Sequence, residues 1–372
     1  MSGYSHQKIR VIMLVDLDYF FAQCEELRNP GLSDKPIVVG MYSGRTEDSG
    51  AVSTANYIAR NYGVKSGIPL YLAKRKLEGV DAVFLPVDYQ YYEKISNQIM
   101  NLLRNYANEF EQVSIDEAYM DVTRRVNGSY EKTKPLVDEI KKMVHQKIGL
   151  KFSVGVGPNK LVAKIASEVN KPDGFTLVKP EEVEKFLAPL AVDKLLGIGK
   201  KTRAKLEAVG IKTIGDLALY DVQKLVDLFG KTLGVYFHNS AMGIDNDPVR
   251  PEGEAGSISR IGTLKQNTKD IQLILEKTDE QIGEILKEVI QNDVYFNQVG
   301  VIAVLTDLST KSRSQKLSNP TRNKELLKRV VKELFEKFLE GAELDVRRVG
   351  VKVSQFSKME DNQKQLTSYF GS

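Results

Sequence analysis

The chain of 372 residues is longer than one ordinary hydrophobic core supports, so we expect roughly two to four domains. Its 42% hydrophobic and 27% charged residues are typical of a globular protein, and its apolar runs are shorter than the roughly 18 residues that span a bilayer. One cysteine and three histidines exclude a disulfide framework and a rich zinc site, while a net charge of +4 permits nucleic-acid binding without arguing for it.

The first predicted element is a buried strand that ends in an acid. Residues 10–16 read Arg-Val-Ile-Met-Leu-Val-Asp, an apolar run typical of a strand covered on both faces. Asp16 at its end could cap the helix that follows, or it could bind a metal ion together with the main-chain carbonyl of Leu17. The strand alone leaves both interpretations open.

The next segment combines a strand at 35–40, a turn-rich loop at 44–50 and a short helix that begins near residue 56. Tyr57 and Arg60 are three residues apart on that helix, so their side chains share a face. The guanidinium group suits phosphate because it donates two hydrogen bonds in one plane. A surface arginine beside a packed tyrosine has the same spacing, and this alternative stays open.

Two adjacent acids, Asp116 and Glu117, lie between helices expected at 89–106 and 135–147. Their flanks, 112–115 and 119–123, predict short strands that meet in a hairpin. Neighbouring carboxylates repel one another unless a cation separates them, so the pair indicates either a divalent metal site or a solvated turn. Together with strands at 10–16 and 151–156, these elements predict a split α/β sandwich of the ferredoxin-like type. Asp16 then lies close to the pair if the two strands are neighbours.

Basic residues follow this predicted sheet. Lys160 and Lys164 are one helical turn apart and Lys171 comes shortly after them, which suits a triphosphate but also an ordinary solvated face. Further along, a glycine-rich turn is typical of a helix-hairpin-helix, where glycines let a phosphate approach the N–H groups of the next helix. A plain helix–helix turn is the alternative. The residues of this turn are Gly197, Gly199, Lys200 and Lys201.

Residues 243–256 are rich in glycine, proline and mixed charges, which predicts an interdomain linker. Residues 257–357 then predict a separate α/β module with strands near 257–265, 300–305, 311–317 and 347–353, and helices at 272–290 and 323–339. Lys311, Arg313 and Lys316 belong to a basic stripe without acids, in which Lys311 and Arg313 alternate and point to one face. The stripe could bind phosphates, or it could keep an edge hairpin soluble.

The tail from residue 358 is polar except near its end, where exposed leucine, tyrosine and phenylalanine are unexpected for a disordered segment. The pattern suits a short helical turn that inserts into a hydrophobic pocket of a partner. Its residues are Gln363, Leu366, Tyr369 and Phe370.

Taken jointly, four motifs over residues 10–356 resemble the Y-family translesion DNA polymerases, specifically the archaeal-type DinB or DNA polymerase IV branch. The motifs are Val15-Asp-Leu-Asp-Tyr-Phe-Phe21, Tyr57-Ile-Ala-Arg60, Ser114-Ile-Asp-Glu-Ala-Tyr-Met-Asp121 and Gly157-Pro-Asn-Lys-Leu-Val-Ala-Lys164. No single motif is specific, but their order and separations are. The terminal residues 363–370 look like the sliding-clamp-binding peptide of that family.

The resemblance implies a multidomain α/β (α+β) right-hand polymerase. Its ferredoxin-like palm would comprise residues 1–20 and 88–177, its fingers 21–87 and its helical thumb 178–242. The linker at 243–256 would lead to a little finger at 257–357 that binds DNA, and the flexible tail would be 358–372.

The resemblance also assigns roles to individual residues. Asp16, Asp116 and Glu117 would be the catalytic carboxylates and would bind two Mg²⁺ ions, which Mn²⁺ can replace, with the Leu17 carbonyl as a further ligand. The incoming nucleotide would contact Phe20, Phe21, Thr54, Tyr57, Arg60 and Lys171, with Phe21 as the steric gate against a ribose 2′-hydroxyl. Ala51, Ser53 and Gly67 would lie over the nascent base pair, where small side chains leave room for damaged bases.

The implied activity is template-directed addition of deoxynucleotides to a primer, with low fidelity and without proofreading, past damaged bases. The expected partners of this monomer are primer–template DNA, deoxynucleoside triphosphates and a sliding clamp, in a cytoplasmic, nucleoid-associated location that the single cysteine also favours. A non-catalytic DNA-binding scaffold that recruits a clamp is the alternative, and a nucleotidyl cyclase on a similar palm is a weaker third option.

Overall fold

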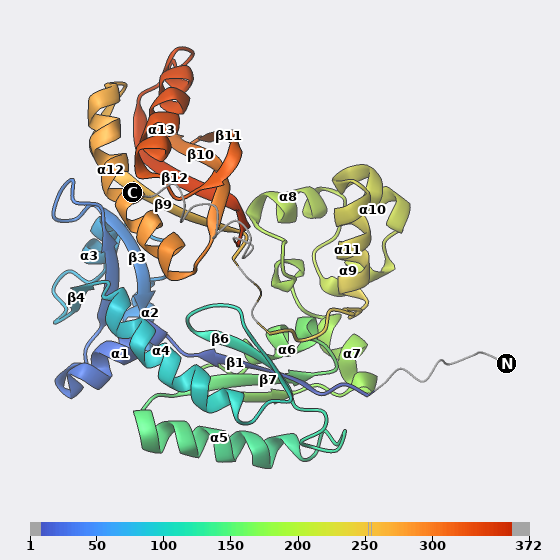
Figure 1. Cartoon of the computed structure of the whole chain (residues 1–372). Coiled ribbons are helices and arrows are strands. Elements are labelled where there is room, and N and C mark those ends of the chain that lie inside the picture. The colour runs from blue at the N-terminus through green and yellow to red at the C-terminus, as the bar shows by residue number, and fades with distance from the viewer. Residues whose placement is uncertain (1–8, 252, 254, 359–372) are drawn as a thin grey trace, which may run out of the picture. The chain divides into compact units, whose positions relative to one another are not determined.

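The computed structural model describes residues 9–251, 253 and 255–358 (Figure 1). The described residues divide into two compact units, one drawn from residues 9–40, 52–68 and 73–253 without residue 252, and the other from 41–51, 69–72 and 255–358. Across the described residues, no helix combines the length and the apolar character needed to cross a membrane.

The first unit is built on a five-stranded sheet in the order β5-β6-β1-β7-β8. The central strand β1 (Ile12–Leu17) pairs antiparallel with β6 (Glu117–Asp121) and with β7 (Phe152–Gly157). β5 (Glu109–Gln112) extends the sheet antiparallel to β6, and β8 (Phe175–Leu177) lies parallel to β7. All six residues of β1 are buried, which agrees with the unbroken apolar run that predicted a strand covered on both faces.

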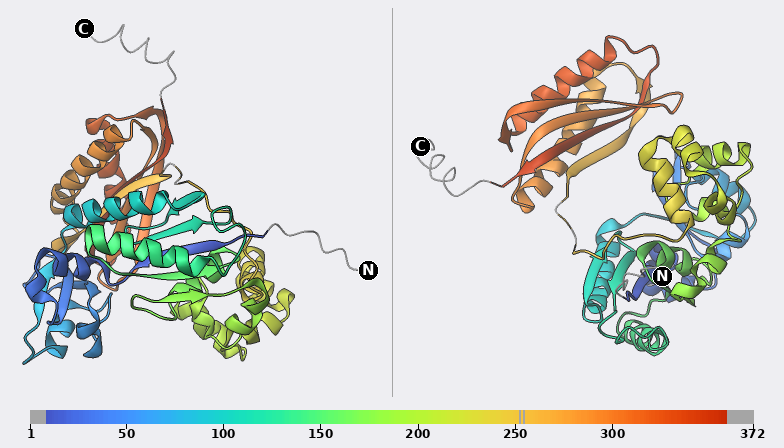
Figure 2. Two further views of the ribbon diagram at one scale, coloured as in Figure 1. Left: turned by 90° about the horizontal axis from the view of Figure 1, so that it is seen from below. Right: turned by 90° about the vertical axis from the view of Figure 1, so that its right-hand side faces the viewer.

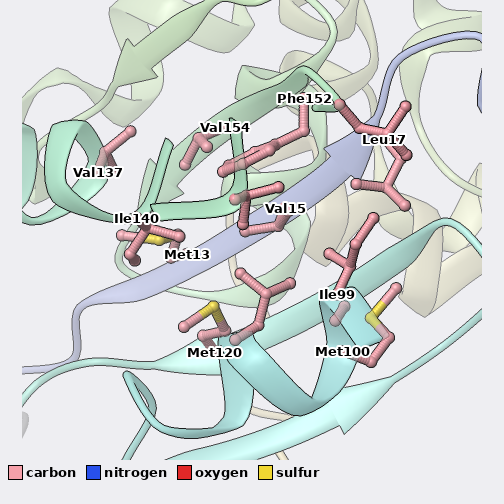
Figure 3. Packing of buried hydrophobic residues seen from close by; sticks show 14 of the residues in the cluster. Met13, Val15, Leu17, Ile99, Met100, Met120, Val137, Ile140, Phe152 and Val154 are labelled. Carbon is pink, nitrogen blue, oxygen red and sulfur yellow. The ribbon is translucent and has the colours of Figure 1, made fainter. Parts of the chain in front are cut away.

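One face of this sheet is covered by α4 (Tyr89–Arg104) and α5 (Thr133–Ile148), as the ferredoxin-like expectation requires. Figure 3 shows Met13 and Val15 of β1 among Ile99 of α4 and Ile140 of α5 in a shared apolar cluster.

The opposite face is covered by α6 (Lys160–Ser167), where Ala163 packs against Ile12 and Leu14. The helix approaches β7 so closely that a Cβ on Gly155 would lie 2.1 Å from the carbonyl oxygen of Ala163. Glycine at this position therefore allows the helix that carries Lys160 and Lys164 to lie directly on the sheet.

The acidic hairpin differs from its predicted boundaries. Strands were expected at 112–115 and 119–123, but β5 ends at Gln112 and β6 begins at Glu117, so residues 113–116 form the turn. Ser114 explains the shift, because its hydroxyl donates to Asp116 Oδ1 at 2.5 Å and accepts from the Asp116 N–H at 3.2 Å. Such local bonds replace the strand ladder.

A three-stranded sheet in the order β3-β2-β4 follows α1 (Phe20–Arg28), and β2 and β4 are parallel. Along the chain, α2 follows β3, and α3 comes between α2 and β4. The bounds are η1 (Pro30–Leu32), β2 (Ile37–Tyr42), β3 (Gly50–Ala55), α2 (Tyr57–Asn61), α3 (Leu70–Lys76) and β4 (Val83–Pro86).

The helical part of the first unit has its own apolar cluster, in which Leu206, Ile214 and Phe237 are almost completely buried. Its elements are η2 (Pro180–Glu182), α7 (Val183–Leu187), η3 (Val192–Lys194), α8 (Lys200–Ala208), α9 (Ile214–Leu219), α10 (Val222–Phe229) and α11 (Lys231–Ala241).

The segment expected to be a linker, 243–256, has no helix or strand among its described residues. Its first part is nevertheless attached to the first unit. Asn159 Nδ2 donates to the Gly243 carbonyl at 2.8 Å, and the Leu161 N–H donates to Asp245 Oδ2 at 3.0 Å.

The C-terminal module is a β-α-β-β-α-β arrangement with strand order β11-β10-β12-β9, all antiparallel. α12 and α13 cover one face of this sheet (Figure 2) and bury Phe296, Phe335 and Val351. The bounds are β9 (Ser257–Thr268), α12 (Ile271–Gln291), β10 (Tyr295–Leu305), β11 (Thr310–Thr321), α13 (Lys324–Leu339) and β12 (Val346–Ser357).

Candidate active site

The strand register brings the predicted acids together. Asp16 is directly opposite Glu117 in the β1–β6 pair, and the Leu17 N–H donates to the Asp116 carbonyl at 2.9 Å. Asp16 is only 4% exposed. The condition stated from the sequence, that the strands of Asp16 and the acidic pair be neighbours, is met.

Two lysines neutralise these carboxylates. Lys171 Nζ lies 2.7 Å from Asp16 Oδ1, while Lys164 Nζ contacts Glu117 Oε1 and lies 3.3 Å from Asp16 Oδ2. Although burial of both ammonium groups opposes their charge, the carboxylates raise the pKa of Lys164 and of Lys171. Both side chains are therefore charged at neutral pH.

Burial also opposes ionisation of the two acids, with different results. A hydrogen bond with Glu117 and the charges of Lys171 and Lys164 outweigh burial and bring the pKa of Asp16 below its usual value. For Glu117, burial and the hydrogen bond with Asp16 raise the pKa to about 7, despite the contact with Lys164. The pair therefore holds less negative charge at neutral pH than two free carboxylates.

The donor atoms fit a hard divalent cation, because they are carboxylate oxygens beside a main-chain carbonyl. Within the described residues, however, no three acidic, histidine or cysteine side chains converge closely enough to ligate one ion. Asp116 is hydrogen-bonded to Ser114, and the lysine ammonium groups stand against Asp16 and Glu117. A metal ion at these carboxylates would therefore displace the ammonium groups of Lys164 and Lys171.

A cavity of about 250 Å³ joins these acids to the predicted nucleotide-binding residues. The guanidinium carbon of Arg60 lies 4.6 Å from the centre of the Tyr57 ring, and Arg60 Nε donates to the Ala55 carbonyl at 2.9 Å. The cavity is lined by Asp16, Leu17, Tyr19, Phe20, Ser53, Thr54, Tyr57, Arg60, Ser66, Asp116, Glu117, Glu168 and Lys171.

Asn56, which sequence reasoning did not single out, fixes the helix that carries Tyr57 and Arg60. Its Oδ1 accepts hydrogen bonds from the N–H groups of Ala59 and Ile37, both at 3.0 Å. Its Nδ2 donates to Glu26 at 3.2 Å. An asparagine directly before a helix is a known N-cap signal, and that signal could have found it.

Of the residues predicted for the sugar and the base, the lining of the cavity includes Ser53 but not Phe21, Ala51 or Gly67. Phe21 is not in the lining of the cavity, and its ring stacks on Tyr92 with centres 4.4 Å apart. Its neighbour Phe20 is in the lining. Ala51 and Ser53 are two residues apart on β3, so their side chains point to the same face of the strand. The Gly67 N–H donates a hydrogen bond to the Val52 carbonyl of that strand. The steric-gate and base-pair roles stay predictions.

The glycine-rich turn adopts the expected type of backbone. Gly197 has φ of +87°, and Gly199 is the N-cap of α8, so the N–H groups at the start of that helix have no side-chain cap. Lys200 and Lys201 are exposed beside them. The 3₁₀ turn η3 precedes the glycine-rich turn, at the position where the helix-hairpin-helix pattern predicts the first helix.

The basic stripe of β11 divides between the two faces of its sheet. Lys311 and Arg313 are opposite the buried Ala303 and Val301, on the helix-covered face. Lys316 is opposite Gln298, on the face that α12 and α13 leave uncovered. Lys352 of β12 points to this same uncovered face, because it pairs with Gly300, two residues from Gln298. The four predicted clamp-binding residues, 363–370, lie outside the described residues.

Comparison with known proteins assigns this arrangement to a class of enzyme. Family models match three parts of the chain: the impB/mucB/samB family at residues 15–168, the thumb domain of DNA polymerase iota at 193–245, and the impB/mucB/samB C-terminal domain at 255–368. A protein of Nitrosopumilus maritimus named DNA polymerase IV is 43% identical over 97% of this chain and 99% of its own. One of Methanosarcina acetivorans with the same name is 42% identical over 94% and 96%.

Solved structures agree with these relatives. A Y-family DNA polymerase chimera of Dbh and Dpo4 has a TM-score of 0.88 at 36% identity and covers 94% of this chain and 100% of its own. An insertion ternary complex of Dbh DNA polymerase has a TM-score of 0.67 with the same identity and coverage. Fold and site thus define a right-hand polymerase with palm, fingers, thumb and little finger. The chain belongs to the impB/mucB/samB family of Y-family DNA polymerases.

Proposed function

We propose that this chain catalyses nucleotidyl transfer in the cavity formed by Asp16, Asp116 and Glu117. The chain is a DNA polymerase of the translesion type, as its family membership and its relatives' names indicate. The observation that supports the location is the cavity itself, where acids from β1 and the β5–β6 turn meet Arg60 of α2 and Lys171.

Polymerases of this family use divalent metal ions, and we propose two Mg²⁺ ions held by Asp16, Asp116, Glu117 and the Leu17 carbonyl. When bound, such ions activate the primer 3′-hydroxyl and neutralise the charge of the triphosphate and the leaving pyrophosphate. The chain's own contribution is to hold the reactants in line and to supply fixed positive charge.

Two side chains around the cavity, Arg60 and Lys171, supply that charge, and Tyr57 adds a neutral hydrogen-bond donor. Arg60 is oriented by its bond to the Ala55 carbonyl, so its remaining N–H groups can bind phosphate oxygens. Tyr57 stacks beside Arg60 and can donate its hydroxyl. Lys171, which also lines the cavity, exchanges its bond with Asp16 for one with the triphosphate.

Replacing Asp116 or Glu117 by alanine tests this assignment. We expect either substitution to lower Mg²⁺-dependent primer extension by on the order of 1,000-fold, because several kcal/mol of charge stabilisation is lost. Glu109→Ala on β5 is the matched control, since its half-exposed carboxylate belongs to the same sheet but lies outside the cavity. Extension at the wild-type rate by Asp116→Ala or Glu117→Ala would refute the site and revive the non-catalytic scaffold.

The remaining partners complete the proposal. One related polymerase, Dbh, has been solved as an insertion ternary complex, and we propose that the partners of this chain are primer–template DNA and deoxynucleoside triphosphates. For this chain we propose that Gly197, Gly199, Lys200 and Lys201 bind the DNA backbone, that the little-finger sheet adds further phosphate contacts, and that the terminal peptide binds a sliding clamp. We also propose that the protein acts as a monomer at the nucleoid.

A further inference from the structure

Asp18 is a second acid in the first motif, two residues after Asp16, yet it has no part in the chemistry proposed above. It is 1% exposed, and its carboxylate is engaged on both oxygens. Ser153 Oγ lies 2.9 Å from Oδ1 and 3.0 Å from Oδ2, and the Asp173 N–H donates to Oδ2 at 2.7 Å. These bonds direct the carboxylate toward β7 and the loop before β8.

The loop that Asp18 binds connects α6 to β8 and carries Lys171. The bond to the Asp173 N–H fixes the backbone two residues after Lys171. Ser153 extends the attachment, because its hydroxyl also accepts a hydrogen bond from the Gly174 N–H at 3.2 Å. Consecutive backbone amides of the loop are thus held by one buried acid and its serine partner.

The loop has a second attachment on the outer surface of the palm. Lys141 Nζ of α5 donates to the Asp173 carbonyl at 2.6 Å and to the Gly174 carbonyl at 3.1 Å. Both attachments involve a charged group, because Lys141 Nζ also pairs with Asp173 Oδ1 at 2.9 Å. They differ in burial: Asp18 is 1% exposed, whereas the Lys141 and Asp173 side chains are 19% and 45% exposed, so water competes more with the Lys141 contact.

We propose that Asp18 is a positioning residue that holds the 171–174 loop so that the Lys171 ammonium group is presented to the triphosphate of the incoming nucleotide. The proposal rests on the proposed function of Lys171. Asp18 touches neither substrate nor metal and acts only through the loop. Loss of its carboxylate therefore weakens nucleotide binding while Asp16, Asp116 and Glu117 keep their places.

Steady-state incorporation of one nucleotide by the full-length protein tests this, with KM for the nucleotide measured separately from kcat. We expect Asp18→Ala to raise KM about 10-fold, as the loss of hydrogen bonds to a charged group would. Asp18→Asn keeps an acceptor for the Asp173 N–H and should restore most of the affinity. Lys141→Ala is the matched control, because it removes the other attachment of the same loop, whose Asp173 side chain is 45% exposed, and its KM should change less than about 2-fold.

A double substitution separates positioning from a general loss of structure. If Asp18 acts through Lys171, then Asp18→Ala should not raise KM further in a Lys171→Ala background. Hydrogen exchange supplies a readout independent of activity: the amides of Asp173 and Gly174 should exchange faster in Asp18→Ala but not in Lys171→Ala. If Asp18→Ala does not fold, Ser153→Ala, which removes only the bridging hydroxyl, should show the same two effects at smaller size.

The outcomes distinguish the proposal from its premise. An additive KM effect in the double variant, an unchanged KM in Asp18→Ala, or unchanged exchange at 173 and 174 would overturn the positioning role. A Lys171→Ala variant with wild-type KM would instead overturn the proposed triphosphate contact, because that single substitution does not depend on Asp18.

Discussion

Phe20 and Phe21 follow one another at the start of α1, yet their rings have different surroundings. Both are nearly buried, but Phe20 lines the cavity beside the acids while Phe21 stacks on Tyr92 and meets the edge of Tyr89. The resemblance assigns the steric gate to Phe21. Replacing either phenylalanine by alanine removes the same volume, but Phe20→Ala enlarges the cavity and Phe21→Ala leaves a space beside Tyr92.

Phe21→Ala is expected to admit ribonucleotides, because removal of the ring leaves room for a 2′-hydroxyl. Exclusion of one small group by shape typically provides roughly 10- to 100-fold discrimination, so ribonucleotide incorporation should rise by about that factor. The measurement is kcat/KM for ribonucleotide relative to deoxyribonucleotide. Phe20→Ala is the control of similar volume and burial. Unchanged sugar selectivity in Phe21→Ala, or the larger change in Phe20→Ala, would remove the gate from Phe21.

For individual residues, the sequence predicted which acids form the site but not the hydrogen-bond and ion-pair partners of those acids. The family resemblance grouped Asp16 with Asp116 and Glu117, and the predicted sheet brought them close on the condition that their strands are neighbours, which the register meets. The partners of Asp18 could not be predicted, since Ser153 and Asp173 are more than one hundred residues away and carry no motif of their own. Nor does a sequence say that Lys164 and Lys171 contact the same carboxylate.

Among the elements, the uncovered face of the little-finger sheet shows why register matters. Alternation alone predicted that Lys311 and Arg313 share a face, and the strand pairing agrees. It could not predict which face the helices cover. The register assigns the uncovered face to Lys316 and, from a distant strand, Lys352.

Replacement of both Lys316 and Lys352 by alanine should weaken binding to primer–template DNA uniformly across sequences. Each lost phosphate contact should lower the slope of log affinity against log salt by about 1. Fluorescence anisotropy over a range of salt concentrations measures both quantities. Lys337→Ala serves as the control, because this exposed lysine belongs to α13 on the covered side. An unchanged salt slope in the double variant would contradict phosphate binding by this face.

Element boundaries were predictable where hydrophobic periodicity is long and less so where side chains compete with the backbone. α12 and α13 agree with their predicted ranges to within a residue at either end. The acidic hairpin does not, because hydrogen bonds between Ser114 and Asp116 end the strand pairing early. A serine two residues before an aspartate is too common a pattern to have predicted that turn.

For the whole molecule, composition predicted several domains, and the described residues form separate apolar clusters accordingly. Glycine and proline marked the segment that precedes the little finger. They gave no indication that residues 243 and 245 are hydrogen-bonded to α6 and to the residue before it. Those bonds depend on tertiary contacts of the first unit, which a local composition signal does not contain.

The terminal peptide, residues 363–370, has the proposed role of binding a sliding clamp, a partner outside this chain. Its sequence places an aromatic pair, Tyr369 and Phe370, in an otherwise polar segment, and burial in a partner's pocket would account for that pattern. Deleting residues 363–372 should therefore abolish stimulation by a sliding clamp on a circular primed template. Synthesis without the clamp should be unchanged, because the active site uses residues of the palm and fingers alone.

The double substitution Tyr369→Ala and Phe370→Ala should reproduce the effect of the deletion, since burial of aromatic side chains would supply most of the binding energy. Gln365→Ala together with Thr367→Ala is the matched control, because it changes polar positions of the same peptide and keeps its length. The measurement is primer extension with and without the clamp, made for the aromatic double variant and for the polar control. Full stimulation of the deleted chain would show that clamp recruitment, if present, uses another surface.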